Sequence, residues 1–438
     1  MIQDLSKNIQ IEYQALMDSL HGRMLCKCNR IRQKAMDSFL RNGFPTKKHE
    51  DWRYNDLSFL DTQDYRVTST IAHVELPENI LAKIKVYKDL FDTIVVVNGR
   101  YSEEYSKLTK GSAYSVFSFD FGLNSKASEV EPYIFEYADY NINVFSAINA
   151  AIARDGVVIK IPDNKELANP ICIININFSD GEAVFSNNRN KIIAGRNSIA
   201  KIIGVDISVG SGVSNIVNDF FIGDFAYIDY YHLQIDENKS YIINNTNVNH
   251  GKNAVFNKVV ISTEGKFIRN NDYILMKNDA AELNMNGLFM PSTDEFIDNH
   301  TFIKHQAQNC TTVENYKGVI DNNGIGVFNG KVLVDQDAQK TNATQTNKNI
   351  LLSDDAVIYT KPELEIYADD VKCNHGSATG NINEDQLYYL KSRGISDESA
   401  RALLLFGFAK EVVASLKNED IQRIVTEQIT KKLNYTLD

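Results

Sequence analysis

The residues with the clearest chemical potential lie near the C-terminus, in the stretch KPELEIYADDVKCNHGSATG at 361–380. Cys373 and His375 stand two positions apart, and in an extended strand such positions project from the same face. Thiolate and imidazole together suit iron or zinc, so the pair could supply part of a metal or iron–sulfur site. The remaining ligands would come from elsewhere in the fold or from another chain. The spacing alone fits a buried cysteine beside a hydrogen-bonded histidine at least as well.

Two other groups of cysteines and histidines are weaker candidates. Cys26 and Cys28 lie two positions apart on an expected helix, where their side chains point about 200° apart and cannot readily share one metal ion. We interpret both as structural. His300, His305 and Cys310 lie close together in DNHTFIKHQAQNC, and they would form a metal site only if the strands folded back to bring them together.

Several common catalytic motifs are absent from the sequence. It contains no G-x-x-x-x-G-K-[ST], H-E-x-x-H, G-x-S-x-G or paired C-x-x-C, which removes the phosphate-binding loop, zinc peptidase, serine hydrolase and structural zinc interpretations. GIGVFNG at 324–330 only approaches a dinucleotide-binding fingerprint, because its third glycine falls one place late, and we interpret it as a β-turn. Asp369 and Asp370 are adjacent, so in a strand they face opposite sides and cannot act as a carboxylate dyad.

Length and charge limit the classes of protein that can carry these residues. A chain of 438 residues is expected to fold into two or three structural units. With 46 basic and 57 acidic residues the formal net charge is −11, so neither nucleic acid nor a membrane is an expected partner. The start of the chain lacks the apolar core of a secretory signal, and no apolar run approaches the ~20 residues that span a bilayer. The five cysteines are scattered and odd in number, so we expect a cytoplasmic protein with reduced thiols.

The first two regions of the chain differ in periodicity. Residues 1–155 begin with one or two amphipathic helices and continue as a mixed α/β region. Residues 156–372 consist of short β-branched and aromatic runs punctuated by glycine and asparagine, which indicate a large β unit: a sandwich, a barrel or a stacked parallel solenoid. No fixed-length repeat is evident. Asparagines inside the strands could hydrogen-bond from turn to turn, about 4.8 Å apart, which slightly favours the solenoid.

The third region, 373–438, is expected to form a helical module of three helices. Asn383 with Gln386 three residues later resembles a capping pair at the start of the first helix, and Gly394 closes that helix. The two helices that follow carry an apolar face that has to pack on something. This face could cap the β unit or serve as a docking surface for a partner.

Three long stretches of the sequence resemble the SufB/SufD family of the SUF iron–sulfur cluster assembly system. They are 338–395, around the cysteine and histidine described first, GFPTKKHEDWRYNDL at 43–57, and FSAINAAIARDGVVIKIPDNKELANPI at 145–171. This resemblance implies a mainly β protein, with a right-handed parallel β-helix core flanked by N-terminal and C-terminal α-helical regions. It therefore favours the solenoid among the three β architectures.

The resemblance also implies a function. Members of the SufD branch are non-catalytic scaffold subunits that pair with SufB through the β-helix and dock a SufC ATPase through the C-terminal helices, supporting nascent cluster assembly and iron acquisition. Nucleotide hydrolysis would then belong to the partner, which fits the missing phosphate-binding loop. The family's Cys-x-His-Gly motif maps onto Cys373 and His375, and its histidine is implicated in building a transient iron–sulfur cluster at the interface with SufB. No cluster is expected to stay bound to the isolated chain.

Some positions separate this chain from the usual patterns of the family. The motif commonly reads Cys-Ser-His-Gly-Ala-Thr, whereas this chain has Asn374 before the histidine and Ser377 after the glycine. SufB-type chains carry a cysteine in the stretch that corresponds to 340–349 and His-Glu-Ala at the motif. Neither feature is present here, so the SufD branch is favoured over a SufB-like paralogue.

Two further alternatives stay open at this point. A β-helix carbohydrate-active enzyme would need a groove with two carboxylates roughly 5 to 10 Å apart on the solenoid face. A homodimer could form in isolation, if the face meant for SufB pairs with itself.

Overall fold

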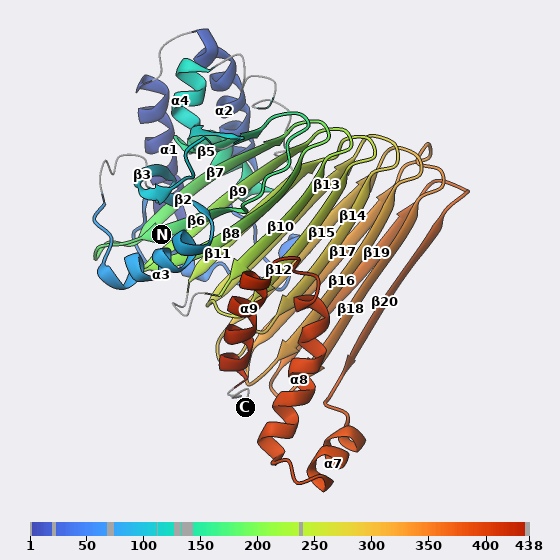
Figure 1. Cartoon of the computed structure of the whole chain (residues 1–438). Helices are drawn as coiled ribbons and strands as arrows, with labels where there is room; N and C mark the ends of the chain where they lie inside the picture. The colour runs from blue at the N-terminus through green and yellow to red at the C-terminus, as the bar shows by residue number, and fades with distance from the viewer. Residues whose placement is uncertain are drawn as a thin grey trace.

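The computed structural model describes residues 2–19, 23–67, 74–111, 113–126, 133, 143–235 and 240–433. Over these residues the chain forms a long stack of β-strands with helices packed beside it (Figure 1). The N-terminal helices lie beside the first strands of the stack, and β19 and β20 lie at its opposite end. The candidate ligands are therefore carried by the far end of the stack.

Within the described residues the strands form two sheets of ten strands each. The first sheet holds β1 (Arg66–Val67), β4 (Ser115–Ser118), β5 (Gly156–Ile161), β7 (Val184–Ala194), β9 (Gly212–Ile222), β11 (Tyr241–Asn249), β13 (Phe267–Met276), β15 (Phe296–His305), β17 (Ile325–Val334) and β19 (Val357–Ile366). The second sheet holds β2 (Asp92–Val97), β3 (Arg100–Lys107), β6 (Ile171–Phe178), β8 (Ile199–Val209), β10 (Tyr227–Gln234), β12 (Val255–Ser262), β14 (Glu282–Phe289), β16 (Thr311–Ile320), β18 (Asn342–Leu351) and β20 (Lys372–Gly380). From β5 onward, consecutive strands alternate between the sheets.

Each pair of consecutive strands makes one turn of a solenoid. From β5–β6 to β19–β20 the chain completes eight turns, and every strand pairs in parallel with the strand one turn further on. From β7 onward a turn takes between 26 residues, as where Tyr241 stands opposite Phe267, and 32 residues, as where Ile325 stands opposite Val357. The expected parallel β-helix core with helical regions at both ends of the chain is confirmed.

The corners of the solenoid repeat more regularly than the strands. In each of the first seven turns one residue adopts the left-handed conformation at the corner after the first-sheet strand, and its backbone N–H donates to a carbonyl at the same corner of the next turn. Asn164 donates to the carbonyl of Arg196 at 2.7 Å, and Asn197 donates to that of Asp224 at 2.9 Å. Asparagine accepts this conformation more readily than most residues. The series is Asn164, Asn197, Phe225, Asn253, Ala280, Asn309 and Lys340, with φ between 51 and 60°.

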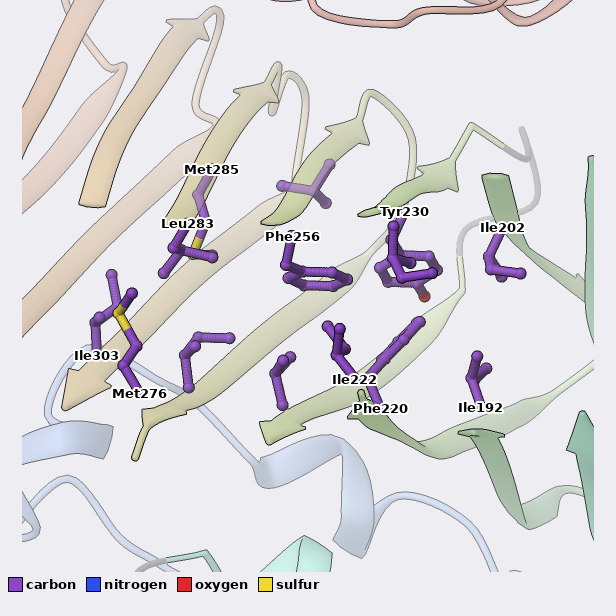
Figure 2. Packing of buried hydrophobic residues seen from close by; sticks show 14 of the residues in the cluster. Ile192, Ile202, Phe220, Ile222, Tyr230, Phe256, Met276, Leu283, Met285 and Ile303 are labelled. Atoms are coloured by element: carbon purple, nitrogen blue, oxygen red, sulfur yellow. The ribbon is translucent and has the colours of Figure 1, made fainter. Parts of the chain in front are cut away.

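A buried apolar core fills the space between the two sheets. Figure 2 shows its middle, where Phe220 on the first sheet faces Tyr230 and Phe256 on the second. The ring centroid of Phe220 lies 4.7 Å from that of Tyr230 and 5.2 Å from that of Phe256. Full burial of one large apolar side chain contributes about 1.5–3 kcal/mol relative to exposure. This core therefore stabilises the stacking of successive turns.

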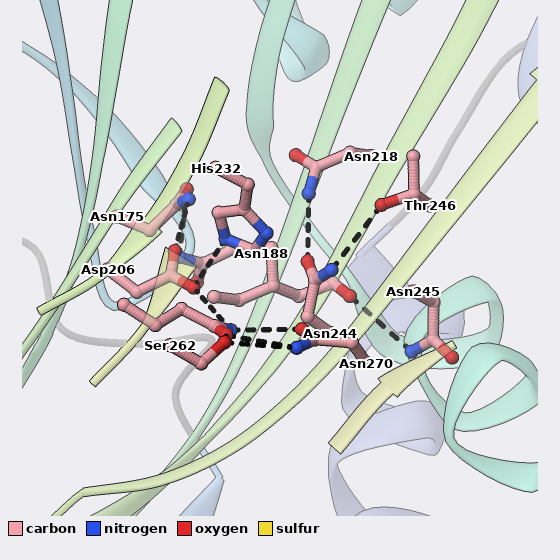
Figure 3. Close-up of polar contacts among 12 residues, drawn as sticks. Asn175, Asn188, Asp206, Asn218, His232, Asn244, Asn245, Thr246, Ser262 and Asn270 are labelled. Carbon is pink, nitrogen blue, oxygen red and sulfur yellow. Dashed lines mark hydrogen bonds and ion pairs between the residues drawn. The ribbon is translucent and has the colours of Figure 1, made fainter. Parts of the chain in front are cut away.

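A ladder of buried amides runs beside the apolar core (Figure 3). Asn190 donates from Nδ2 to Asn218 Oδ1 at 3.0 Å, and Asn218 donates in the same way to Asn244 at 2.9 Å. These three residues lie on successive strands of the first sheet. The expected turn-to-turn hydrogen bonding of asparagines is confirmed, and it satisfies amides that would be costly to bury unpaired.

Helices cover the outer faces of both sheets. Phe145 of α6 (Val144–Ile152) is buried in one cluster with Val213, on the outer face of the first sheet. Val412 of α8 (Asp397–Val413) is buried in another cluster with Leu288, on the outer face of the second sheet. The N-terminal helices are α1 (Ile2–Ser19), α2 (Arg23–Asn42), α3 (Glu78–Leu90), α4 (Phe119–Ser125) and α6 (Val144–Ile152), with short 3-10 turns at Glu50–Trp52 and Ser58–Asp61. The C-terminal helices are α7 (Glu384–Ser392), α8 (Asp397–Val413) and α9 (Glu419–Lys432).

The expected cap and end of the first C-terminal helix are confirmed. Asn383 Oδ1 accepts a hydrogen bond from the backbone N–H of Gln386 at 2.9 Å, and Gly394 follows α7 with a φ of 89°. The strands extend past both expected region boundaries, since β2 and β4 precede residue 156 and most of β20 follows residue 372. The division into 1–155, 156–372 and 373–438 stays a prediction. Among the described residues, no helix is both long enough and apolar enough to cross a membrane.

Candidate metal-binding site at the last strand

The last strand of the second sheet, β20, is paired along one edge only. It runs parallel to β18, and no other strand of the described chain pairs with its second edge. Its residues from Asn374 to Gly380 are exposed. Backbone N–H and C=O groups along such an edge are available to pair with another strand.

Cys373 and His375 lie on the same face of β20, as predicted. In the register of the sheet Cys373 stands opposite Ala343, and His375 stands opposite Gln345. Ala343 and Gln345 are both buried between the sheets. Cys373 and His375 are therefore the last residues of two columns of side chains that stack from turn to turn inside the solenoid. Cys373 is half-buried against the apolar core, whereas His375 is exposed. The pair therefore sits where the interior of the solenoid opens to solvent.

Ser377 continues this inward face of β20. Its Oγ lies 3.0 Å from Oγ1 of Thr360 on β19, so a hydrogen bond joins the two sheets in the last turn. Asn349 on β18 donates from Nδ2 to Thr379 Oγ1 at 3.4 Å. Ser377, which departs from the usual motif, is therefore hydrogen-bonded to Thr360. This bond helps to hold the strand that carries both candidate ligands.

The environment of Cys373 keeps its thiol protonated. Burial raises the pKa of the Cys373 thiol above its ordinary value, and a backbone hydrogen bond from Ala343 offsets this only in part. A thiol in this state is a poor nucleophile. A soft metal ion that binds there would have to displace the proton, so metal binding at Cys373 should be favoured by higher pH.

The described residues do not complete a metal site around this pair. Nowhere in the described ranges do three or more His, Cys, Asp or Glu side chains come together in a metal-binding arrangement. Most metal centres in proteins use three or four protein ligands. If Cys373 and His375 bind a metal, water or another chain has to supply the rest.

Two family profiles together match almost the whole chain. The profile described as "SUF system FeS cluster assembly, SufBD core domain" matches residues 177–408, and the one described as "SufBD protein N-terminal region" matches residues 5–173. The chain belongs to the SufBD family of the SUF system. The core profile covers the solenoid from its second strand to α8, including both candidate ligands.

Curated relatives of this SufBD-family chain agree over most of its length. It is 28% identical over 438 residues to the iron–sulfur cluster assembly SufBD family protein slr0076 of Synechocystis sp., covering 96% of this chain and 94% of the relative. It is 27% identical over 409 residues to the iron–sulfur cluster assembly protein SufD of Escherichia coli, covering 92% of each chain. It is 26% identical over 305 residues to the SufD protein of Bacillus subtilis, covering 66% of each chain.

One of the stretches that carried the resemblance to the SufBD family forms a strap across the outer face of the first sheet. The strap, Glu50–Asn55, reaches from the middle of the solenoid to its last turn. The Trp52 ring lies 3.9 Å from the guanidinium carbon of Arg269, and Asn55 donates from Nδ2 to Asp298 Oδ2 at 2.8 Å. Its role in holding the last turn was not predicted from the sequence.

A pocket of about 450 Å³ lies between the strap and the first sheet. Glu50, Glu363 and Glu365 line it, so it resembles the acidic groove that a carbohydrate-active enzyme would need. Each of these glutamates is ion-paired: Lys361 contacts Glu50 and Glu363, and Lys331 contacts Glu365. This pocket of the SufBD-family chain therefore offers paired rather than free glutamates.

The weaker candidates from the sequence do not come together. His300 faces outward, with Nε2 3.0 Å from Asp298 Oδ1, whereas His305 is buried and bonds Oγ1 of Thr312 at 2.9 Å. The two histidines are five positions apart on one strand, so they face opposite sides of the sheet. Burial lowers the pKa of His305 to about 4, and it stays neutral near pH 7.

Outside β20, the cysteines whose side chains the structure describes are buried. Cys310 is fully buried and donates to the carbonyl of Asn278 at 3.4 Å, and Cys28 is buried as well. The side chain of Cys26 lies outside the described residues. The structural interpretation of Cys28 is consistent with its burial, and Cys310 is held apart from His300 by the sheet.

The interpretation of GIGVFNG as a β-turn is wrong. The turn ends before Gly324, and Ile325 begins β17, so most of the motif is strand. Its glycines are required by packing rather than by a turn. A Cβ at Gly326 would come within 2.8 Å of Phe289, and a Cβ at Gly330 would come within 2.3 Å of Gln345.

Proposed function

We propose that this chain is a SufD-type scaffold subunit of the SUF machinery, which joins a SufB-type subunit through the end of its solenoid. The observation that carries the proposal is β20, an exposed strand with one unpaired edge among the described residues. A second solenoid that pairs along this edge, and along the outer edge of β19 in the first sheet, would continue both sheets and cover the open interior. The SufD protein of Escherichia coli matches 92% of the chain, which supports this choice.

The candidate ligands lie on the surface that such a pairing would bury. Cys373 and His375 supply two ligands, a thiol and an imidazole, that suit a nascent iron–sulfur cluster. A SufB-type partner would supply the others, so the cluster would be transient cargo of the interface and would not stay on the isolated chain. The chain itself then acts as a non-catalytic scaffold.

The C-terminal helices divide into a covering part and an exposed part. Leu405 and Val412 of α8 and Val425 of α9 are buried in the cluster that includes the outer face of the second sheet, so these helices cap the solenoid. On α7, by contrast, Tyr388 is 75% exposed and Tyr389 is 57% exposed. We propose that α7 and its neighbours dock a SufC-type ATPase, which would carry the nucleotide chemistry that this chain lacks.

Co-purification tests the partnership directly. The chain is co-expressed with a tagged SufB-type and an untagged SufC-type protein, and the complex is isolated by the SufB tag. We expect all three chains to be recovered, and a Tyr388→Ala/Tyr389→Ala variant to keep SufB but to lose most of the SufC that binds to this chain. An Ile11→Ala variant, which removes an exposed apolar side chain on α1, serves as the control and should recover both. Stable association with neither partner would overturn the proposal.

A further inference from the structure

A buried glutamate lies two turns behind the candidate ligands. Glu314, on β16, is fully buried between the two sheets. The register places it in one column with Gln345 and then His375, on successive strands of the second sheet. Neighbouring strands are about 4.8 Å apart, so Glu314 stands about 10 Å behind His375 along the interior of the solenoid.

Gln345 connects the two positions. Its Nε2 donates to Glu314 Oε2 at 2.7 Å, and both side chains are fully buried. Gly330 on the facing sheet leaves the space for this amide, since a Cβ there would come within 2.3 Å of Gln345 Nε2. Gln345 Oε1 has no hydrogen-bond partner within the described ranges. This oxygen can therefore accept a further hydrogen bond on the side of the column where His375 lies.

No cation neutralises Glu314 within the part of the chain that the structure describes. The charged group that acts on it from across the interior is Asp272 on β13, which raises its pKa further and is itself ion-paired with Lys258 on β12. Tyr316 on the same strand is neutral, because burial raises the pKa of its phenol well above the ordinary value. Burial raises the pKa of Glu314 to about 7, and the neighbouring Gln345 and Thr301 side chains offset this only in part.

Packing alone does not explain a carboxyl group at this place. One turn further on, the same column is filled by an amide of the same size, Gln345. A buried amide costs less than a buried carboxylate without a cation. Buried ionisable groups with strongly shifted pKa values are concentrated at functional sites, and this one lies directly behind the open end of the solenoid.

We propose that Glu314 is the internal counter-charge of the cation site on β20. Below neutral pH it carries a proton while Cys373 and His375 are unoccupied, and the binding of a divalent cation to them favours its ionisation. The proposal rests on the function proposed above. In this step the carboxylic acid of Glu314 loses one proton to bulk water and no electron is transferred. The resulting negative charge partly balances the two positive charges of the bound cation.

Cation binding and ionisation of Glu314 are then linked. At pH 8 the carboxylate is largely present before the cation arrives, whereas at pH 6 binding has to expel its proton. For a divalent cation about 10 Å away at the open end of the solenoid, an effective dielectric constant of about 50, between those of a protein surface and bulk water, makes this attraction worth on the order of tenfold in affinity. Replacing Glu314 by glutamine removes the negative charge that attracts the cation, and it also removes the ionisable proton.

The test is an anaerobic Co²⁺ titration of the full-length chain at pH 6 and pH 8, followed by the visible absorption of the bound ion. We expect Glu314→Gln to weaken binding by on the order of tenfold at pH 8 and by much less at pH 6. The wild-type chain should also release more protons per bound Co²⁺ near pH 7 than the variant. Glu365→Gln is the matched control, because it removes a half-exposed carboxylate from the last turn, and its effect should be small and equal at the two pH values.

Two outcomes would overturn the proposal, and they can be told apart. If His375→Ala abolishes Co²⁺ binding but Glu314→Gln changes the affinity by the same factor at pH 6 and pH 8, the cation site stands and the counter-charge is wrong. If Co²⁺ binding is unaffected by His375→Ala, both the cation site and its counter-charge are wrong. A cooperative thermal unfolding transition of Glu314→Gln at pH 6, at a temperature no lower than that of the wild type, shows that the variant is folded.

Discussion

The ring of Tyr54 stacks on the ring of Tyr359, with centroids 3.9 Å apart and planes inclined by 11°. Tyr54 belongs to the strap that follows α2, and Tyr359 lies on β19 in the last turn of the solenoid. A second contact joins the same parts, since Lys361 Nζ lies 2.6 Å from Glu50 Oε1. The N-terminal part of the chain therefore holds the turn that carries the candidate ligands.

Removing this stack should loosen the last turn more than the rest of the solenoid. We expect Tyr54→Ala to lower the free energy of unfolding by about 1 kcal/mol, since an aromatic pair adds about 0.5–1.5 kcal/mol and both rings are partly exposed. Amide hydrogen exchange should accelerate in β19 and β20 and stay unchanged in β9 and β11. Tyr388→Ala, at an exposed tyrosine of α7, is the control; equal acceleration in every strand would show that the strap has no local role.

The buried carboxylate of Asp219 should be essential for the N-terminal half of the solenoid. It lies 2.9 Å from Arg189 Nη2 and 2.7 Å from Lys191 Nζ, and all three side chains are buried. Asp219→Asn would leave two buried cations without a counter-charge, so we expect a loss of about 3–5 kcal/mol in chemical denaturation. Asp294→Asn, which breaks a surface contact of 3.9 Å with Lys266, should cost less than about 1 kcal/mol.

The same carboxylate predicts part of the acid denaturation. Burial alone would raise the pKa of Asp219, but Arg189 and Lys191 hold it at about 2, below the ordinary value of 3.8. A depressed pKa in the folded state means that the stabilisation is present above the ordinary pKa and is lost as the pH falls toward 2. The difference in unfolding free energy between wild type and Asp219→Asn should therefore shrink between pH 4 and pH 2. A difference that is constant over this range would contradict the ion pairs.

Glu314 should make stability depend on pH in the opposite direction to Asp219. Its pKa is raised by burial from 4.5 to about 7, so between these values the folded chain holds a proton that the unfolded chain has released. The stability of the wild-type chain therefore falls as the pH rises through this window. We expect Glu314→Gln to be more stable than wild type at pH 8, by about 3 kcal/mol, and equally stable at pH 4. Thermal unfolding at the two pH values measures this, and a variant that is less stable at pH 8 would contradict the buried, unpaired carboxyl.

The sequence alone was enough to predict the same-face arrangement of Cys373 and His375. That prediction needs only the two-residue period of a strand, and the register with Ala343 and Gln345 bears it out. The same period explains why the side chains of His300 and His305 project from opposite faces of the sheet. This conclusion requires that one continuous strand carries both residues, which only the structure shows. Local rules were sufficient for both pairs.

The relation between Glu314 and His375 could not be predicted in this way. The two residues belong to different turns, and the length of a turn varies between 26 and 32 residues, so no fixed period in the sequence aligns them. The corner residues carry a better signal, since the left-handed positions from Asn164 to Lys340 mark the first seven of the eight turns and four of the seven are asparagine. Glu314 follows Asn309, and Gln345 follows Lys340, by five positions, so aligning the sequence on these corners places both in one column. The last turn, Val357–Gly380, has no left-handed residue at this corner, so the alignment does not reach His375.

The central claim is that His375 takes part in cluster assembly at an interface with a SufB-type partner. It is tested most directly by rebuilding iron–sulfur clusters anaerobically on the purified complex of the three proteins, with iron, a sulfur donor and a reductant, and following the visible absorption of the cluster. We expect His375→Ala to lower the amount of cluster severalfold while the complex stays intact in gel filtration, and Asn374→Ala, on the opposite face of the strand, to have no effect. Normal cluster assembly on an intact His375→Ala complex would contradict the account.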